Sequence, residues 1–456
     1  MDTQQPLNAL DHLEQYPLLQ AILGRRSRRF GRGMSIGAGP LAYTSHYSPE
    51  PLTELEEALV VFAACGITGF ALADLDYGPG QGGNMLAGVM GRTIASPDAV
   101  DAVSLIVTND TATYLIKRPQ DFSPVEIPAL VQLAHDREFV ELYRRLRVKI
   151  ATGRCAPPVK PGYNFNINNW ALYAAGSTYF LPVAATTEAY LNVLLEVFNP
   201  AMGLYGIDER NHFQPAGIGS FAKSRGGSLD DNPGNGRVFT IEAIEQTLIE
   251  SIGIEQGMLH QNLALMVQAL GLGGYPNFAR HEYGWFEALG FRLGTLPSTQ
   301  YVGAGRLITF IMNLLGRNQP YPYPLGLERD GQVLLKPFCP PYYSSMKEAV
   351  EAFVTYKFGA RGLGLNLPRT TDWKDPDAVT HGILPVSAEA VAATSAYCEY
   401  IYDRYGRFPA YTAPYRTMLG YQATHVDVEF YERFYTPDAL TETQRLHHEQ
   451  WHGAGQ

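Results

Sequence analysis

Four arginines and one serine stand close together near the start of the chain, in the stretch Gly24-Arg-Arg-Ser-Arg-Arg-Phe30. In an extended backbone, alternate side chains point to the same side, so Arg25, Ser27 and Arg29 would project together. A guanidinium donates hydrogen bonds in a fixed fork and a serine hydroxyl adds a short donor, which together suit a phosphate group. By itself, however, the pattern is more typical of a solvent-exposed helix end than of a phosphate site.

A second stretch, HQNLALMVQALGLGG, ends at Gly274 and belongs to the strongest helical pattern of the chain, over residues 240–272. Its apolar residues occupy most sides of a helix, which predicts a buried helix. The closing glycines would end this helix and leave a backbone that another group can approach closely. A core helix with a glycine cap would explain the stretch without any ligand.

Taken together, the two stretches resemble the nitroreductase (flavin reductase-like) superfamily. Its members carry an early Arg-x-Ser-x-Arg/Lys motif, which residues 25–30 match position for position. The resemblance implies bound FMN, with its phosphate, ribityl chain and pyrimidine edge held by Arg25, Ser27 and Arg29. The second stretch is similar to the family's helix at the dimer core, which ends in A-x-x-L-G-L-G. The resemblance also implies that Gln261 lies at the flavin. It further implies that the backbone N–H groups of Leu272, Gly273 and Gly274 lie near flavin N5.

A third stretch, GRTIASPDAVDAVSLIVTNDTATYLI, is similar to a segment of the SagB-type dehydrogenases within this superfamily. Arg92, Thr93 and Ser96 stand at corresponding places, and the resemblance implies flavin contacts for Arg92 and Ser96. The family also has a late basic residue that reaches the phosphate. Lys336 is its best candidate, ahead of Arg292 and Arg306.

The resemblance implies an α+β, nitroreductase-like fold with a central, mainly antiparallel sheet flanked by helices, in an intertwined homodimer. We therefore expect four segments: an N-terminal half of the domain over 15–150, an insertion or lid over 151–239, a C-terminal half over 240–345 and a C-terminal extension over 346–456. Locally, VDAVSLIVTND and TATYLIKRP predict a strand hairpin, and YPYPLGLERDGQVLLKPF predicts strand, turn and strand. Helices are predicted over 128–150, 345–360 and 387–405.

The composition limits the classes of partner. The formal charge of −10, from 35 Lys and Arg against 45 Asp and Glu, gives no support to nucleic-acid binding. No apolar run is long enough to span a membrane, and the first residues do not resemble a signal peptide. The four scattered cysteines fit reduced thiols. We therefore expect a cytoplasmic protein that acts on a small molecule or a peptide.

Two histidine patterns raise the question of a metal. The alternation of His425, Asp427 and Glu429 places three potential ligands on one face of a strand, but a solvated strand face has the same pattern. His448 and His452 have the i, i+4 spacing of a helix, yet their place beside Gly453 favours a frayed helix end. The sequence therefore predicts no metal site.

The function that the resemblance implies is FMN-dependent oxidoreduction, either reduction of an acceptor by NAD(P)H or SagB-like oxidation of a bound metabolite or peptide. No catalytic residue is identified, because the flavin carries the redox step and requires no acid or base side chain. A binding or scaffold protein that keeps the flavin fold without turnover remains the alternative.

Overall fold

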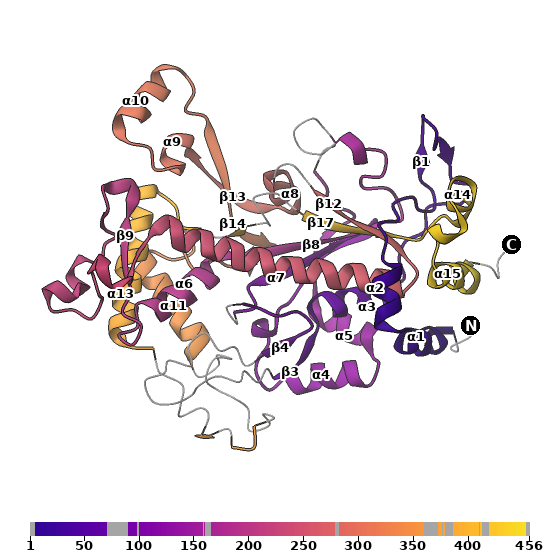
Figure 1. Ribbon diagram of the computed structural model, residues 1–456, viewed down its shortest axis with the longest axis horizontal. Coiled ribbons are helices and arrows are strands. Elements are labelled where there is room, and N and C mark those ends of the chain that lie inside the picture. Colours follow the sequence, from indigo (N-terminus) through magenta and orange to yellow (C-terminus); the bar gives the residue numbers. More distant parts are fainter. Residues whose placement is uncertain are drawn as a thin grey trace.

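The computed structural model describes residues 5–70, 90–97, 100–157, 159, 166–278, 282–359, 373–375, 377–378, 386–409, 411–412 and 419–452. The fold is mixed α and β, with a mainly antiparallel central sheet and flanking helices (Figure 1). Among the described helices, each is too short or too polar to cross a membrane.

The central sheet has seven strands, in the order β12-β17-β8-β5-β6-β7, with β16 also paired to β8. Every pairing in this sheet is antiparallel. In chain order the strands are β5 (Val103–Thr108), β6 (Ala112–Ile116), β7 (Arg147–Thr152), β8 (Thr178–Ala185), β12 (Gly273–Phe278), β16 (Tyr411–Thr412) and β17 (Leu419–Thr424). The predicted hairpin is confirmed as β5 and β6, which pair directly.

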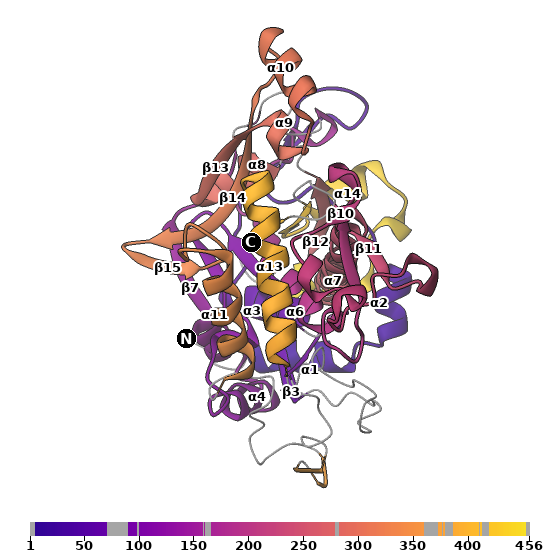
Figure 2. The ribbon, with the colours of Figure 1, turned by 90° about the vertical axis from the view of Figure 1, so that its left-hand side faces the viewer.

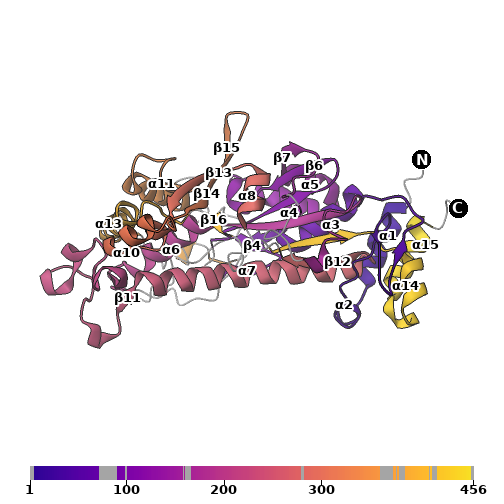
Figure 3. The ribbon, with the colours of Figure 1, turned by 90° about the horizontal axis from the view of Figure 1, so that it is seen from above.

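The longest helix, α7 (Ile241–Ala269), packs along one face of this sheet beside α3 (Glu54–Cys65) (Figure 3). Thr240 caps the start of α7 by accepting a hydrogen bond from the backbone N–H of Ala243. The helix is not buried on most sides as predicted, because Ile254, Gly257 and Met258 form an exposed stripe in this single chain.

Smaller sheets and further helices surround the centre. The small sheets pair β1 (Ser35–Ile36) with β2 (Tyr43–Thr44), β3 (Ile67–Phe70) with β4 (Met90–Arg92), β9 (Tyr205–Asp208) with β10 (Gln214–Pro215) and β11 (Val238–Thr240), and β14 (Pro320–Arg329) with β13 (Phe291–Pro297) and β15 (Gln332–Leu335). The other α-helices are α1 (Gln5–Gln15), α2 (Leu18–Gly24), α4 (Ile127–His135), α5 (Phe139–Leu146), α6 (Thr186–Val197), α8 (Glu282–Leu289), α9 (Ser298–Tyr301), α10 (Arg306–Leu314), α11 (Met346–Phe358), α13 (Ala388–Tyr405), α14 (Val428–Phe434) and α15 (Glu442–His452).

These outer elements gather at opposite ends of α7. At one end α6, α11 and α13 pack together, and an arm built from β13, α9, α10 and β14 projects from the body (Figures 1 and 2). At the other end, α1 and α2 lie near α14 and α15, so the two ends of the described chain are close together. A small second core forms there around Phe30, Tyr275 and Phe430.

The segments predicted as an insertion and as an extension both contribute strands to the central sheet. Strand β8, from the predicted insertion over 151–239, lies in the middle of the central sheet with all its residues buried. Strand β17, from the predicted extension over 346–456, lies between β12 and β8. Both segments are therefore integral to the sheet. The single helix predicted over 128–150 is also wrong, because Arg137 has a positive φ between α4 and α5 and the chain then enters β7.

The other local predictions hold. The predicted strand, turn and strand are confirmed as β14 and β15, and the helices predicted over 345–360 and 387–405 are confirmed as α11 and α13.

Candidate functional site

The arginine-rich stretch lies against the end of the long helix. Helix α2 ends at Gly24, and the chain then makes a tight turn, in which the N–H of Arg28 donates to the carbonyl of Arg26 (3.2 Å). Arg28 forms an antiparallel bridge to Gly274 at the start of β12. Three residues later Gly31 forms a second bridge, to Val426. The two stretches that carried the family resemblance are thus in direct backbone contact.

Alternate side chains of this stretch have different surroundings. Arg26 donates to the carbonyl oxygens of Leu23 (3.0 Å) and Arg25 (2.9 Å), and so caps the end of α2. Arg28 donates to the carbonyl of Ala439. Its guanidinium carbon also lies 5.5 Å from the ring centre of Tyr431. Arg26 and Arg28 therefore hold the local fold together.

Arg25 and Ser27 are exposed, and neither side chain makes a hydrogen bond or ion pair with the part of the chain that the structure describes. Arg25 lies close enough to Tyr421 to act on its hydroxyl: burial raises the pKa of Tyr421, while the Arg25 charge acts in the opposite direction. Burying a fixed charge without a partner costs free energy, whereas an exposed charge stays hydrated and remains able to bind an anion. These donors remain open to a ligand.

Arg29 is half-buried and anchored beside them. Its Nη1 donates to Oδ1 of Asn168 (2.7 Å), and its guanidinium carbon lies 4.8 Å from the ring centre of Tyr275. The hydroxyl of Tyr431 accepts from the backbone N–H groups of Arg29 (3.0 Å) and Phe30 (3.1 Å). These contacts hold the side chain of Arg29 and the backbone of Arg29 and Phe30 in place.

Two glycines permit this close approach of chains. A Cβ on Gly31 would lie 2.3 Å from Oγ1 of Thr424, and one on Gly274 would lie 2.5 Å from the ring of Tyr421. Since real Cβ atoms do not come so close, side chains at either position would push the strands apart. Glycine is needed here for close packing of protein against protein.

The backbone groups expected at the flavin are only partly open. The N–H of Leu272 donates to the carbonyl of Val267 (3.0 Å), in the turn that ends α7 through Gly271 at φ +77°. The N–H of Leu272 is therefore engaged within the chain, and a contact of Leu272 with a ligand stays a prediction. Gly273 and Gly274 are buried in β12, where they pair with Thr424 and Ala423.

The contact between residues 25–30 and the start of β12 is called the junction below. Gln261 lies apart from it, on the exposed stripe of α7. From Gln261 to the last residue of α7 is a rise of about 12 Å along the helix axis. Within one chain, Gln261 is therefore not brought beside Gly273 and Gly274.

Arg92 and Ser96 are committed to a different structure. The Arg92 side chain is 2% exposed, with Nη1 3.6 Å from Oε1 of Glu255 and 3.8 Å from Oδ1 of Asp101. Ser96 donates its hydroxyl to Oε2 of Glu255 (3.0 Å), and the N–H of Val103 donates to Oε1 (3.2 Å). This network joins β4 and β5 to α7 and uses the groups that were expected to contact flavin.

Lys336 is not part of the junction either. It follows β15 and is exposed, with its ammonium 4.0 Å from the ring centre of Tyr343. It borders a cavity of about 420 Å³ whose wall also includes the buried ion pair of Arg118 and Glu188, at 3.0 Å. The expectation that Lys336 joins Arg25 at a phosphate is therefore not met within one chain.

The histidine patterns were misjudged. His425 and Asp427 are buried and Glu429 is exposed, so of the solvated or interface face expected for them, the solvated form is not what the structure shows. Asp427 caps α14 by accepting from the N–H of Phe430 (3.1 Å). The end of the chain is also not frayed up to residue 452, because α15 is formed and His447 within it is buried.

Several residues near the junction carried no recognisable signal in the sequence. Tyr275 and Tyr421 flank the arginines from β12 and β17, and Asn168 lies far away in the chain. Only the pairing of β17 with β12 brings them together, and that pairing is not readable from local patterns. No known protein-family model matches the chain, and a search of curated proteins finds no similar sequence.

Proposed function

We propose that this protein is an FMN-dependent oxidoreductase of the nitroreductase type. The observation that carries the proposal is the contact between the two stretches, through the bridge of Arg28 to Gly274, with the donors of Arg25 and Ser27 left open beside it. Such a contact is what the family resemblance requires and what an unrelated basic helix end would not need.

The donors fit the group in kind. One exposed guanidinium and one exposed hydroxyl match a phosphate, and half-buried Arg29, held by Asn168 and Tyr275, matches a less charged polar edge. Bound FMN would supply hydride and electron transfer. The chain would bind the phosphate through Arg25 and Ser27, and cations beside the ring would favour its reduced, anionic form.

The proposal includes a homodimer. The apolar face of α2 that precedes the arginines is exposed in the single chain, through Leu18, Leu19, Ile22 and Leu23. The stripe of Ile254 and Met258 on α7 is exposed as well, and α2 packs beside α7. Apolar surface of this kind favours association, and a second copy over α2 would also enclose Arg25. Gln261, on the exposed stripe of α7, would then face the partner.

The first experiment asks whether the protein binds flavin. The purified chain is incubated with FMN, freed of excess and examined for the yellow absorbance of oxidised flavin, which dithionite should bleach. Anaerobic addition of NADH or NADPH then separates a reductase, which is bleached, from a dehydrogenase that takes electrons from its own substrate. A chain that stays colourless after FMN is added is neither of these, and the proposal fails.

The second experiment tests the dimer. We expect light scattering to give twice the mass of one chain, and Met258→Asp to give a monomer that has lost flavin. The matched control is Met202→Asp, since both methionines are 40% exposed but Met202 lies outside the stripe. A wild-type monomer that binds flavin would overturn the dimer while leaving the flavin site intact.

A further inference from the structure

Three side chains from distant parts of the sequence meet in a buried cluster: Glu56 in the first turn of α3, His425 just after β17 and His447 in α15. Glu56 and His425 are 1% exposed and His447 is 7% exposed. None of them takes part in the flavin proposal. Buried ionisable groups are rare unless they are paired or bind a ligand, so the cluster requires a physical account.

Both imidazoles face the same carboxylate through Nε2. The Nε2 of His447 lies 2.7 Å from Oε1 of Glu56, and the Nε2 of His425 lies 3.2 Å from Oε1 and 3.1 Å from Oε2. One ligand atom from each of the three residues lies within 4.8 Å of the others. Ligands placed about 2.0–2.1 Å from a tetrahedral zinc ion lie roughly 3.3 Å apart, so small shifts would suffice.

The carboxylate is held ionised and oriented. Burial acts to raise the pKa of Glu56, but the hydrogen bonds from His425 and His447 outweigh it and lower the pKa. Oε2 also accepts from the backbone N–H (2.7 Å) and hydroxyl (2.9 Å) of Thr53, in the capping box of α3. Oε2 is thus held by the helix cap and also lies beside His425, while Oε1 faces both histidines.

The other side of the His425 ring faces a second carboxylate. Its Nδ1 lies 3.9 Å from Oε2 of Glu50. With a metal on Nε2, the N–H of a neutral ring stands on Nδ1, on the side of that carboxylate. Histidine ligands in proteins usually donate their second N–H to a carboxylate in this way. Glu50 is itself held by Arg32 at 2.9 Å.

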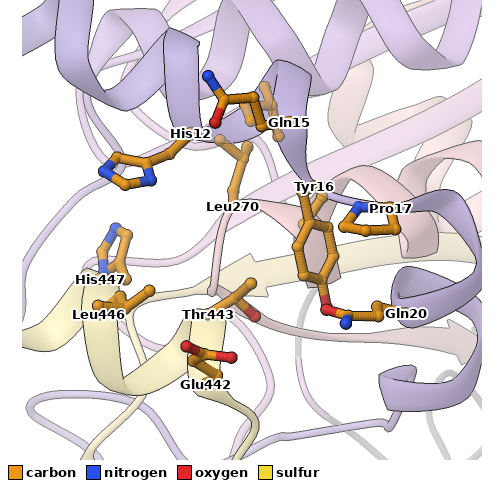
Figure 4. Close-up of a pocket in the computed structure, with 12 residues that line it drawn as sticks. His12, Gln15, Tyr16, Pro17, Gln20, Leu270, Glu442, Thr443, Leu446 and His447 are labelled. Atoms are coloured by element: carbon orange, nitrogen blue, oxygen red, sulfur yellow. The ribbon is translucent and has the colours of Figure 1, made fainter.

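The cluster also has a route to solvent. His447 lines a pocket of about 210 Å³ between α1, the end of α7 and α15. Figure 4 shows His447 at one side of this pocket, across from Tyr16 and Pro17 in the turn between α1 and α2. An ion and its waters could reach the histidine from this side.

We propose that Glu56, His425 and His447 form a binding site for one divalent transition-metal ion, with two imidazole nitrogens and one carboxylate oxygen as ligands. This donor set suits Zn²⁺, with a water in the fourth position. The ion ties α15 and the residue after β17 to α3. The backbone carbonyl of His425 also accepts from the N–H of Arg32 (3.0 Å). By fixing His425, the ion therefore also stabilises the backbone that directly follows the arginine-rich stretch.

The test uses the full chain, stripped with a chelator and titrated with Zn²⁺ by calorimetry. We expect one equivalent to bind per chain and the thermal unfolding midpoint to rise. Co²⁺ in place of zinc should give the visible absorption of a four-coordinate site. If the folded, stripped wild-type chain binds no Zn²⁺, or if zinc leaves its unfolding midpoint unchanged, the proposal is wrong.

Variants assign the site. His447→Ala should weaken Zn²⁺ binding by more than the roughly 10–100-fold that losing a partner of a ligand costs, and Glu50→Gln should weaken it within that range. The matched control is His135→Ala, because His135 is an exposed histidine in the last turn of α4. Should His447→Ala fail to fold, His425→Gln serves in its place. Unchanged affinity in a folded variant of either ligand would overturn the site. None of these measurements depends on flavin.

Discussion

Two arginine–serine pairs of this protein had the same predicted role and have opposite surroundings. Arg25 and Ser27 are exposed and keep their donors open. Arg92 instead forms an ion pair with buried Glu255, and Ser96 donates a hydrogen bond to it. The difference lies in what each pair faces. A stretch that leaves a helix at the surface can keep its charges for a ligand, but an arginine between two strands and a helix must be neutralised within the protein.

The comparison teaches that residue type and spacing identify donors but not whether the fold has already used them. Pairing with Glu255 makes Arg92 a residue that joins β4 and β5 to α7. The absence of such a partner among the described residues makes Arg25 the better binding residue. The two pairs can be separated by experiment.

The largest effect is expected from the buried pair. Glu255→Met leaves the Arg92 charge without its nearest carboxylate, and removing one partner of a buried ion pair costs about 3–5 kcal/mol of unfolding free energy. Urea unfolding measures it. The double variant Arg92→Met/Glu255→Met removes both charges and should be more stable than Glu255→Met alone. A single variant as stable as the wild type would show that Arg92 is not held by this pair.

The next largest effect is expected at the open pair. Arg25→Ala should weaken FMN binding by about 2 kcal/mol, or about 30-fold, through loss of a charged hydrogen-bond donor to phosphate. Its unfolding free energy without flavin should stay within about 0.5 kcal/mol of wild type, as for other surface changes. Fluorescence titration with FMN measures the affinity.

The control for Arg25 is its neighbour Arg26→Ala, which removes an equal charge whose hydrogen bonds go to the end of α2. Arg26→Ala should keep the affinity nearly unchanged. Equal losses in both variants would mean that general positive charge, and not a phosphate site at Arg25, attracts the flavin.

The smallest effect separates the two serines. Ser27→Ala should weaken FMN binding by about 1 kcal/mol, whereas Ser96→Ala should leave binding unchanged and lower the unfolding free energy by a similar amount, because Ser96 donates to Glu255. Fluorescence titration with FMN and urea unfolding, made on both variants, test these opposite expectations. A Ser96→Ala protein with impaired flavin affinity and normal stability would show that Ser96 contributes to flavin binding.

Local structure was predictable where short-range pattern and tertiary structure agree. The β5–β6 hairpin follows from two apolar runs joined by a polar turn, and α13 begins at Ala388, directly after Ser387, which caps it by accepting from Ala390 N–H. The contact between residues 25–30 and Gly274 was expected only through the resemblance.

Long-range pairing could not be predicted in this way. Strand β8 was hidden in an apolar run that gave no periodicity, since it is buried throughout. Glu56 and His447 are separated by most of the chain and meet only because α15 packs against the body. Of that cluster, the sequence pattern singled out only His425, as a potential ligand beside Asp427 and Glu429, and neither of those two belongs to the cluster.

The strand order has a consequence for how the chain is made. Strand β17 ends at Thr424, yet it lies between β12 and β8. While the ribosome is still adding the residues after Phe278, both neighbours present unpaired backbone edges, which are templates for aggregation. A nascent chain halted before β17 would expose two such edges at once, so the central sheet is closed only after residues 419–424 have been made.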